Sequence, residues 1–273
     1  MSKTILITGT SSGLGRSTAK LFQSKGWNVV ATMRTPEKET ELTKLERTLV
    51  ARLDVQDDQS IESAVEAGLA KFGRIDALVN NAGYGAVGPL EATPFDKVRR
   101  QFDVNVLGLL AVTKALLPHF RANRSGVIVN ISSMAGRVAF PLGALYHGSK
   151  FAVEGLSESL QYELATFGVR VKVVEPGGIM TDFGGRSLDF SNDPDLTEYQ
   201  PIVQKSVSIL GSLLEKGSSA DQIAEVIYTA TTDEKDQLRY EAGADAIQIL
   251  SGRRAADDAT FFAGMKAEFQ PSA

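Results

Sequence analysis

The sequence has no cysteine and only two histidines among its 273 residues. Without thiols there can be neither a disulfide framework nor thiolate chemistry, and His119 and His147 alone are too few soft ligands for a structural zinc site. The formal net charge is -4 and the pI is near 5.4. A nucleic-acid surface usually requires a basic stripe. We therefore expect no metal site and no nucleic-acid partner.

Long apolar runs are missing as well. No stretch approaches the roughly 20 consecutive apolar residues that a membrane span needs. The chain passes from Met1-Ser2-Lys3 straight into Ile5-Leu6-Ile7, which leaves no room for a signal peptide. Its 43% hydrophobic and 23% charged content is that of an ordinary globular protein. These features predict a cytoplasmic protein with no membrane span.

Short apolar runs alternate with amphipathic stretches along the chain. The expected strands are Thr4–Thr8, Asn28–Met33, Leu49–Leu53, Ala77–Asn80, Val127–Ile131, Val169–Val174 and Gln237–Glu241. Such short, often fully apolar strands are typical of parallel strands covered on both faces, and the intervening helical stretches imply βαβ units. The pattern predicts one doubly wound α/β domain over residues 1–273, with helices on both faces of a parallel sheet.

Several residues mark the expected helix ends. Asp57 can cap a helix that ends before Gly73, and Ser219 and Gln222 have the spacing of a capping box. Thr93-Pro94 offers an N-cap followed by proline at the first helical position.

A glycine-rich turn, Thr8-Gly9-Thr10-Ser11-Ser12-Gly13-Leu14-Gly15, follows the first expected strand and opens the first helix. Backbone N–H groups and the helix dipole at such a turn bind the pyrophosphate of a dinucleotide. Gly9 would permit the tight turn, while Gly13 and Gly15 would allow close approach of ligand and sheet. No Gly-Lys-Ser/Thr follows, which excludes a nucleoside-triphosphate P-loop here. The alternative is a flexible surface turn.

Tyr146 and Lys150 are four residues apart and would share one face of a helix. A tyrosine hydroxyl with a pKa of about 10 is a poor acid or base near neutrality, and a nearby positive charge lowers that pKa. Ser133 lies thirteen residues upstream, at the end of an expected strand. Together these residues indicate acid–base chemistry at a carbonyl. The alternative is an exposed aromatic residue and a solvated lysine.

Read in order, the motifs resemble those of the short-chain dehydrogenase/reductase family, which implies a Rossmann-type fold. They are the glycine-rich turn, Asn80-Asn81-Ala82-Gly83, Val104-Asn105-Val106-Leu107-Gly108, Ile131-Ser132-Ser133, Tyr146-His147-Gly148-Ser149-Lys150 and Pro176-Gly177-Gly178-Ile179-Met180-Thr181. The resemblance covers roughly residues 3–182. Ala31-Thr32-Met33-Arg34 and the segment 146–155 look most like the 17-beta-hydroxysteroid dehydrogenase and retinol dehydrogenase branch with its bacterial relatives.

The resemblance implies roles for four catalytic residues. Tyr146 is the general acid for reduction and the base for oxidation, and Ser133 hydrogen-bonds the substrate oxygen. Lys150 lowers the Tyr146 pKa and holds the nicotinamide ribose, while Asn105 supports a proton relay through water. Ser132 is the alternative to Ser133, which is favoured because its thirteen-residue spacing to the tyrosine matches the steroid-dehydrogenase branch.

The resemblance also implies cofactor contacts. Asp54-Val55 would contact adenine, Asn81 and Gly83 would approach the cofactor, and Ile179 would lie against the carboxamide. The full set of expected cofactor-binding residues is Gly9, Ser11, Ser12, Gly13, Leu14, Gly15, Arg34, Asp54, Val55, Asn81, Ala82, Gly83, Tyr146, Lys150, Pro176, Gly177, Ile179 and Thr181.

Arg34 indicates a preference for NADP(H) over NAD(H). An NAD-selective site needs a carboxylate near the end of the second strand, but no acid occurs there until Glu37. The planar guanidinium group suits a phosphate, to which it can donate two parallel hydrogen bonds. Ser11 and Ser12 could reach the same 2′-phosphate. The alternative is an arginine that is simply solvated.

Substrate recognition is expected in residues 182–217, interpreted as a loop-like flap followed by an amphipathic helix that closes an apolar pocket. Simple packing of a surface helix is the equally weighted alternative. The expected substrate is an aldehyde, ketone or secondary alcohol with a sizeable apolar body. A catalytically silent cofactor-binding sensor and a sugar-nucleotide epimerase are the other functions considered, the epimerase being disfavoured by the glycine spacing and the short C-terminal part.

Two long helical stretches, Asp103–Phe120 and Ser149–Thr166, combine apolar with small residues and could form a homodimer or homotetramer, as family members commonly do. The same faces could instead lie wholly against the sheet. His147 should point about 100° away from Tyr146 on a helix and therefore lie at the surface. His119, after Pro118 at an expected helix end, should be solvated.

Overall fold

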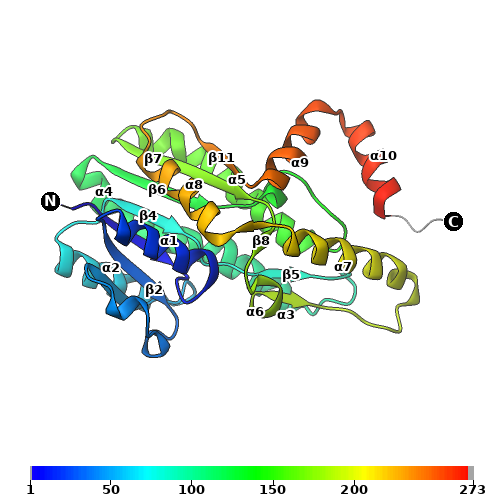
Figure 1. Cartoon of the computed structure of the whole chain (residues 1–273), viewed down its shortest axis with the longest axis horizontal. Coiled ribbons are helices and arrows are strands. Elements are labelled where there is room, and N and C mark those ends of the chain that lie inside the picture. The colour runs from blue at the N-terminus through cyan, green and yellow to red at the C-terminus, as the bar shows by residue number, and fades with distance from the viewer. Residues whose placement is uncertain (1, 270–273) are drawn as a thin grey trace.

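The computed structural model describes residues 2–269, which form a single α/β domain around a seven-stranded parallel sheet (Figure 1). The strand order is β11-β7-β6-β4-β1-β2-β3. The bounds are β1 (Thr4–Thr8), β2 (Asn28–Met33), β3 (Thr48–Arg52), β4 (Ala77–Asn80), β6 (Gly126–Ile131), β7 (Val169–Pro176) and β11 (Arg239–Ala242). The predicted doubly wound fold is confirmed, and all seven expected strands are present within a few residues of their expected ends.

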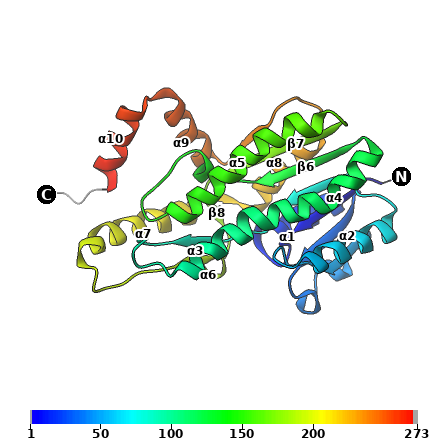
Figure 2. The same ribbon diagram turned by 180° about the vertical axis from the view of Figure 1, so that it is seen from behind.

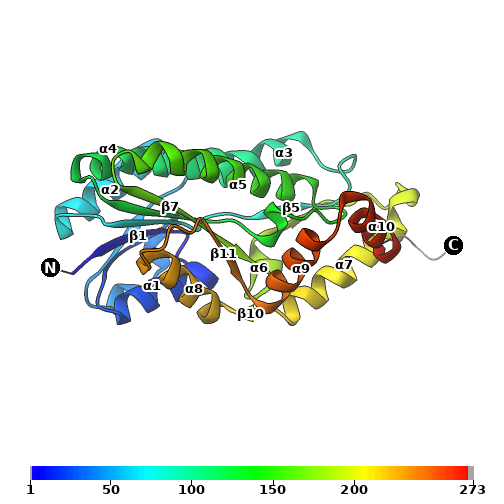
Figure 3. The same cartoon turned by 90° about the horizontal axis from the view of Figure 1, so that it is seen from above.

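Helices cover both faces of the sheet, as the edge-on view shows (Figure 3). On one face α1 (Gly13–Ser24) packs against α8 (Ala220–Thr232). The other face carries α2 (Asp58–Phe72), α4 (Leu109–Asn123) and α5 (Ala144–Ala165), with α4 and α5 in front in Figure 2. Each layer buries its own apolar cluster against the strands, one around Phe22 and one around Phe120. Burial on both faces explains why the strands β1, β2, β4 and β6 are mostly apolar.

Capping residues fix several helix ends as expected. The Asp57 carboxylate accepts a hydrogen bond from the Ser60 N–H, and Gly73 ends α2 with φ of 76°. Ser219 and Gln222 form the predicted capping box at α8. The expectation at Thr93-Pro94 is wrong by one residue: α3 (Phe95–Phe102) starts after Pro94, whose ψ of 143° is extended rather than helical.

The sheet reverses its direction of growth between β1 and β4. From β1 the chain adds β2 and β3 on one side, and from β4 it adds β6, β7 and β11 on the other. Neighbouring crossover connections therefore diverge at the carboxyl ends of β1 and β4. In open α/β sheets such a switch point leaves a crevice where ligands bind.

The stretch predicted as one helix over Asp103–Phe120 is composite. A π-helical turn, Asp103–Gly108, joins α3 to α4, and Pro118 lies inside α4 rather than at its end. Single π-turns within helices often accompany functional sites. Within residues 2–269, no helix is both long and apolar enough to cross a membrane.

Two small parallel sheets frame the segment after β7, and neither was predicted. One pairs β8 (Ile179–Met180) with β10 (Ser218–Ser219), and the other pairs β5 (Gly85–Val87) with β9 (Leu188–Phe190). Between β8 and β10 lie α6 (Phe183–Arg186) and α7 (Gln200–Glu215), the latter matching the expected amphipathic helix. Two further helices, α9 (Ala244–Ala255) and α10 (Asp258–Phe269), follow β11.

Candidate active site

The glycine-rich turn connects β1 to α1 at the switch point. Gly9 has φ of 73°, and a Cβ on Gly15 would lie 2.3 Å from the Gly9 carbonyl oxygen, so side chains are strained or excluded at both positions. Ser12 is the N-cap of α1, but its side chain makes no capping hydrogen bond, and the first turn holds no acidic residue. These features fit a phosphate group, because the N–H groups at the helix start are not used by the N-cap side chain.

Asn81 fastens this turn to the end of β4. Its side-chain amide donates to the carbonyl oxygens of Thr8 and Gly9, at 2.9 and 3.1 Å. The Thr8 hydroxyl in return accepts from the backbone N–H groups of Asn81 and Ala82, both at 3.0 Å. Asn81, expected at the cofactor, thus also shapes the turn itself. Sequence reasoning missed the part that Thr8 plays in this arrangement.

Ser133, Tyr146 and Lys150 lie together at the carboxyl end of β6. Ser133 is the second residue after this strand and forms a side-chain hydrogen bond with Tyr146, near the start of α5. The Lys150 amino group lies 5.7 Å from the centroid of the Tyr146 ring and donates to the Ile131 carbonyl oxygen at 2.8 Å. The structure therefore brings together three residues that are up to 17 positions apart in the sequence (150 − 133).

Burial controls the protonation of this cluster. It raises the pKa of Tyr146, an effect that the hydrogen bond with Ser133 opposes. Burial also lowers the pKa of Lys150 to about 8, although the negative charge of Glu154 acts in the other direction. From the sequence, Lys150 is expected to lower the pKa of Tyr146, but in the structure of the protein alone that pKa is raised. The physical reason is desolvation, which disfavours the charged forms of both residues.

Asn105 lies in the π-helical turn and is buried, 3% exposed. Its amide donates to the Tyr84 carbonyl oxygen at 2.9 Å and to the Ser149 hydroxyl at 3.2 Å, and its oxygen accepts from the Tyr84 N–H. The Ser149 hydroxyl in turn donates to the Tyr146 carbonyl oxygen at 2.7 Å. Ser149, which sequence reasoning missed, thus links Asn105 to the helix that carries Tyr146 and Lys150.

The two candidate serines differ in what they contact. The Ser133 hydroxyl donates to the Pro176 carbonyl oxygen at 3.2 Å and accepts from the Ala135 N–H at 3.1 Å. The Ser132 hydroxyl is buried and has no hydrogen-bond partner among the described residues. Of these two serines, Ser133 forms a hydrogen bond with Tyr146, so the geometry favours it for the serine role.

The Pro176–Thr181 loop is held in place by a residue far along the chain. The Gly178 N–H donates to the carboxylate of Asp245 at 2.6 Å, and a Cβ on Gly177 would lie 2.2 Å from that same carboxylate. At the other end of the loop, Thr181 faces Gly13, where an added Cβ would be 3.5 Å from its side chain. Asp245, in α9, was not anticipated from the sequence.

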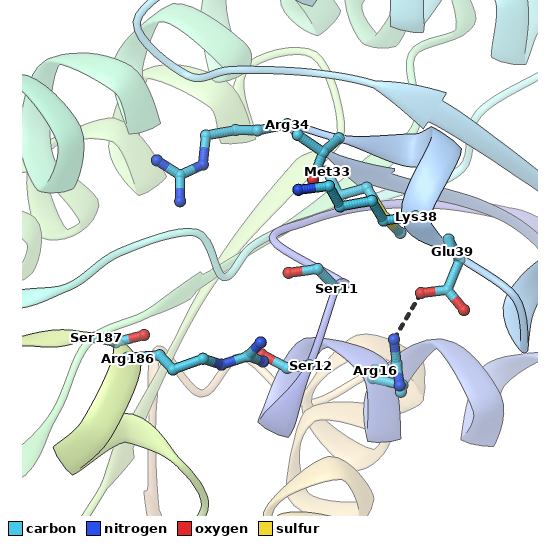
Figure 4. Close-up of a pocket in the computed structure, with 10 residues that line it drawn as sticks. Ser11, Ser12, Arg16, Met33, Arg34, Lys38, Glu39, Arg186 and Ser187 are labelled. Carbon is cyan, nitrogen blue, oxygen red and sulfur yellow. Dashed lines mark hydrogen bonds and ion pairs between the residues drawn. The ribbon is translucent and has the colours of Figure 1, made fainter.

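Arg34 lies at the rim of a cavity of about 540 Å³ beside the glycine-rich turn (Figure 4). Residues of the turn, of the end of β2 and of the segment after β8 surround it: Ser11, Ser12, Arg16, Met33, Arg34, Thr35, Lys38, Glu39, Arg186 and Ser187. Arg34 and Lys38 are exposed and have no ion-pair partner in the described part of the chain. The place and the cationic lining of this cavity fit the adenosine end of a dinucleotide that carries a 2′-phosphate.

Glu39 is the only acidic residue among those that line this cavity, but its oxygens are already engaged. One accepts from the N–H groups of Glu41 and Leu42, at 2.8 and 2.9 Å, and the other forms a 2.6 Å ion pair with Arg16. Burial opposes the ionisation of Glu39, yet these bonds and the charge of Arg16 outweigh it and lower the pKa. A carboxylate so occupied is a poor acceptor for ribose hydroxyls.

The Asp54-Val55 pair follows β3 at the same edge of the sheet. Val55 is buried against the π-helical turn, where a Cβ on Gly108 would lie 2.7 Å from its side chain. The Asp54 carboxylate accepts from the Gln56 N–H at 3.1 Å. The adenine contact of both residues stays a prediction.

Both expectations about the histidines are wrong. His147 is buried, because the loop after Ser133 folds over it: its Nδ1 lies 3.0 Å from the Ala135 carbonyl oxygen, and its Nε2 accepts from the Phe140 N–H at 3.1 Å. Burial lowers its pKa. The half-buried His119 is bonded to the backbone of Ile75 through Nε2. Residues 2–269 contain no group of three or more His, Asp or Glu that could hold a metal ion.

Comparison with known proteins agrees with this geometry. The model of the short chain dehydrogenase family matches residues 3–190. The chain therefore belongs to this family, and it is an oxidoreductase of that kind.

Among curated proteins, an uncharacterised oxidoreductase of Schizosaccharomyces pombe is 42% identical over 231 residues, which are 85% of this chain and 97% of the relative. Retinol dehydrogenase 8 of Bos taurus is 38% identical, over 72% of this chain and 68% of its own. This similarity is consistent with the retinol dehydrogenase-like branch suggested by the sequence.

Solved structures give the same assignment. A short-chain dehydrogenase from Streptomyces avermitilis has a TM-score of 0.84 and 35% identity, covering 99% of this chain and 98% of its own. ElxO with NADP bound has a TM-score of 0.73 and 29% identity, covering 88% of this chain and 98% of its own. A nicotinamide cofactor is therefore supported.

Proposed function

We propose that this protein interconverts a carbonyl compound and an alcohol with NADP(H) as cofactor, using Tyr146 as general acid or base. The observation that carries the proposal is the cluster at the end of β6, where Tyr146 is hydrogen-bonded to Ser133 and adjoins Lys150. This cluster lies beside the Pro176–Thr181 loop, in which Thr181 faces Gly13 of the glycine-rich turn. Acid–base residues and cofactor-binding turn thus share one end of the sheet.

The chemistry divides between cofactor and protein. When bound, the nicotinamide supplies or removes the hydride. Ser133 and Tyr146 hold the substrate oxygen by hydrogen bonds, and Tyr146 gives it a proton in reduction or takes the proton in oxidation. Lys150 contributes positive charge beside the phenol, which favours the phenolate needed for oxidation. Asn105 and Ser149 keep the start of α5 in register with the π-helical turn.

The preference for NADP(H) rests on the charges around the cavity in Figure 4. Arg34 and Lys38 line it without a counter-ion among the described residues, while Glu39 is occupied by Arg16 and two backbone N–H groups. A 2′-phosphate would find cationic donors there, and the 2′-hydroxyl of NAD(H) would lack a carboxylate acceptor.

The substrate is proposed to carry an apolar body that lies against residues 182–217, acting as a flap with its following helix. Met180, Phe190 and Val207, in or next to this segment, are large apolar side chains that are 42–52% exposed. In this proposal, these exposed side chains supply the apolar surface that the substrate contacts.

The proposed function is tested by following NADPH and NADH absorbance with a panel of aldehydes and ketones of increasing apolar size. We expect turnover with NADPH and little with NADH. Tight NADPH binding without turnover on any substrate would instead favour a catalytically silent sensor of the same fold.

We also propose a homodimer or homotetramer formed through the helical stretches Asp103–Phe120 and Ser149–Thr166. Leu107, Phe151 and Tyr162, on these helices, are 46–68% exposed. Light scattering of the wild-type protein at micromolar concentration should give the mass of two or four chains, and a monomer would contradict the proposal.

A further inference from the structure

Arg186, from the segment proposed as the substrate flap, lines the same cavity as Arg34. It ends α6 and precedes β9, the short strand that pairs with β5. Figure 4 shows its guanidinium group directed toward the glycine-rich turn at Ser12. A residue of the substrate-side segment thus reaches the adenosine end of the cofactor site.

The charges around the cavity are unbalanced. Four cationic residues line it, Arg16, Arg34, Lys38 and Arg186, against the single carboxylate of Glu39. Arg16 is taken up by Glu39 and Glu41. Arg186 has one ion pair, with Asp182 at 2.9 Å, and both side chains are more than half exposed. Such an exposed pair is weak, so a phosphate can compete for the guanidinium group.

We propose that Arg186 is a second ligand of the cofactor's 2′-phosphate, together with Arg34, and that the phosphate thereby ties the flap to the cofactor-binding turn. The inference rests on the proposed preference for NADP(H). Arginine suits this role because its fork can donate two hydrogen bonds to one phosphate. The exchange breaks the ion pair with Asp182, the residue immediately before α6.

The consequence is that residues 181–186 would reach both the glycine-rich turn and the 2′-phosphate. Thr181, immediately before the flap, faces Gly13 of the glycine-rich turn, and Arg186 comes five residues later and lines the cavity beside that turn. The ordering of the segment that precedes the proposed substrate helix α7 would then depend on the 2′-phosphate. NADPH should therefore lower the substrate KM relative to NADH in a way that requires Arg186.

The test measures equilibrium binding of NADPH and NADH by fluorescence to wild type, Arg186→Gln, Arg34→Ala and a control, Arg121→Ala. Arg121 is an exposed arginine of α4 on the opposite layer. We expect Arg186→Gln to weaken NADPH binding about fivefold to tenfold and NADH binding less than twofold, because one charged phosphate contact is lost. The control should change neither.

Two further measurements isolate the phosphate. Adenosine 2′,5′-bisphosphate should raise the unfolding temperature of wild type more than that of Arg186→Gln, while 5′-AMP should act equally on both. Asp182→Asn, which frees the guanidinium group, should tighten NADPH binding about twofold. In the double variant with Arg186→Gln this gain should disappear.

An equal loss of NADPH and NADH affinity in Arg186→Gln would overturn the proposal, because it would indicate a contact with the shared pyrophosphate or a change in the flap itself. Unchanged NADPH affinity would overturn it as well. If Arg34→Ala loses NADPH selectively while Arg186→Gln does not, only the flap contact fails. If wild type binds NADH as tightly as NADPH, the proposed cofactor preference fails, and the flap contact fails with it.

Discussion

The two halves of the site are built in opposite ways. At the end of β6 the functional groups are largely buried and already bonded to the protein: Lys150 to the Ile131 carbonyl oxygen, Ser133 to Pro176 and Asn105 to Tyr84. Around the cavity beside the glycine-rich turn, Arg34 and Lys38 are exposed and have no ion pair among residues 2–269. The buried half has its geometry fixed in advance, which catalysis requires. In the exposed half, the positively charged side chains of Arg34 and Lys38 become ordered only when a ligand binds them.

The largest effect should come from the buried half. Tyr146→Phe keeps the ring but removes the transferable proton, so kcat should fall by roughly 10²–10⁴-fold. NADPH affinity should stay near that of wild type. The measurements are steady-state kcat and the NADPH dissociation constant, with Tyr162→Phe, an exposed tyrosine of the same helix, as the matched control. Turnover within tenfold of wild type would remove Tyr146 from the acid role.

The neighbouring serines give the next largest contrast. Ser133→Ala removes the hydroxyl that bonds Tyr146, and kcat should fall by about 10²-fold, the usual loss for one donor at a developing charge. Ser132→Ala removes a buried hydroxyl without a hydrogen-bond partner among the described residues, and activity should stay within about threefold. Kinetic comparison of the two variants decides the assignment, since a larger loss in Ser132→Ala would reverse it.

A smaller and more selective effect is expected in the exposed half. Arg34→Ala removes charge-assisted hydrogen bonds typically worth about 1.5–3 kcal/mol, and exposure places this contact at the lower end. NADPH binding should therefore weaken roughly tenfold, with little change for NADH. The measurement is kcat/KM with each cofactor. A wild type that prefers NADH, or an equal loss for both cofactors, would contradict the prediction.

The smallest expected effect is on the stability of the fold, and it comes from Glu175 in β7. Burial and the adjacent Glu154 carboxylate raise the pKa of Glu175 to about 7, although Arg137 and Arg239 oppose this. Because the folded pKa exceeds the ordinary value of 4.5, the contribution of this group to stability is complete below pH 4.5 and is lost as the pH rises through about 7.

Glu175→Gln should therefore unfold at a temperature a few degrees above wild type at pH 8 and close to it at pH 5. Calorimetry at the two pH values measures the difference, with Glu163→Gln on the exposed side of α5 as control. A difference that does not change with pH would show that Glu175 is ionised throughout this range.

Sequence reasoning worked where local pattern and tertiary environment coincide. The strands Thr4–Thr8, Asn28–Met33 and Ala77–Asn80 have the predicted bounds because each is a short, largely apolar run that the fold buries. The pairs β5–β9 and β8–β10 were missed, since strands of two or three residues carry no periodicity and exist through partners many residues away.

The same limit applies within the site. Tyr146, Lys150 and Ser133 stand out by their spacing and lie together in the structure. Asn105 was expected from the family resemblance, and Ser149 links it to the helix that carries Tyr146. Asp245, Ser149 and Glu39 are ordinary polar residues whose roles depend on which backbone N–H or side chain the fold places beside them. The error at His147 has a similar cause, because helical geometry gives the direction of a side chain but not which loop covers it.

The bond between Asp245 and the Gly178 N–H also has a consequence for how the chain matures on the ribosome. All four expected catalytic residues have been synthesised by residue 150, yet the loop after Pro176 is without its carboxylate partner for another 67 residues beyond Gly178. β11, which pairs with β7 along Val173–Pro176, is equally late. A nascent chain can thus form β1 and β2 early, while the loop from Pro176 to Thr181 is fixed only when α9 emerges.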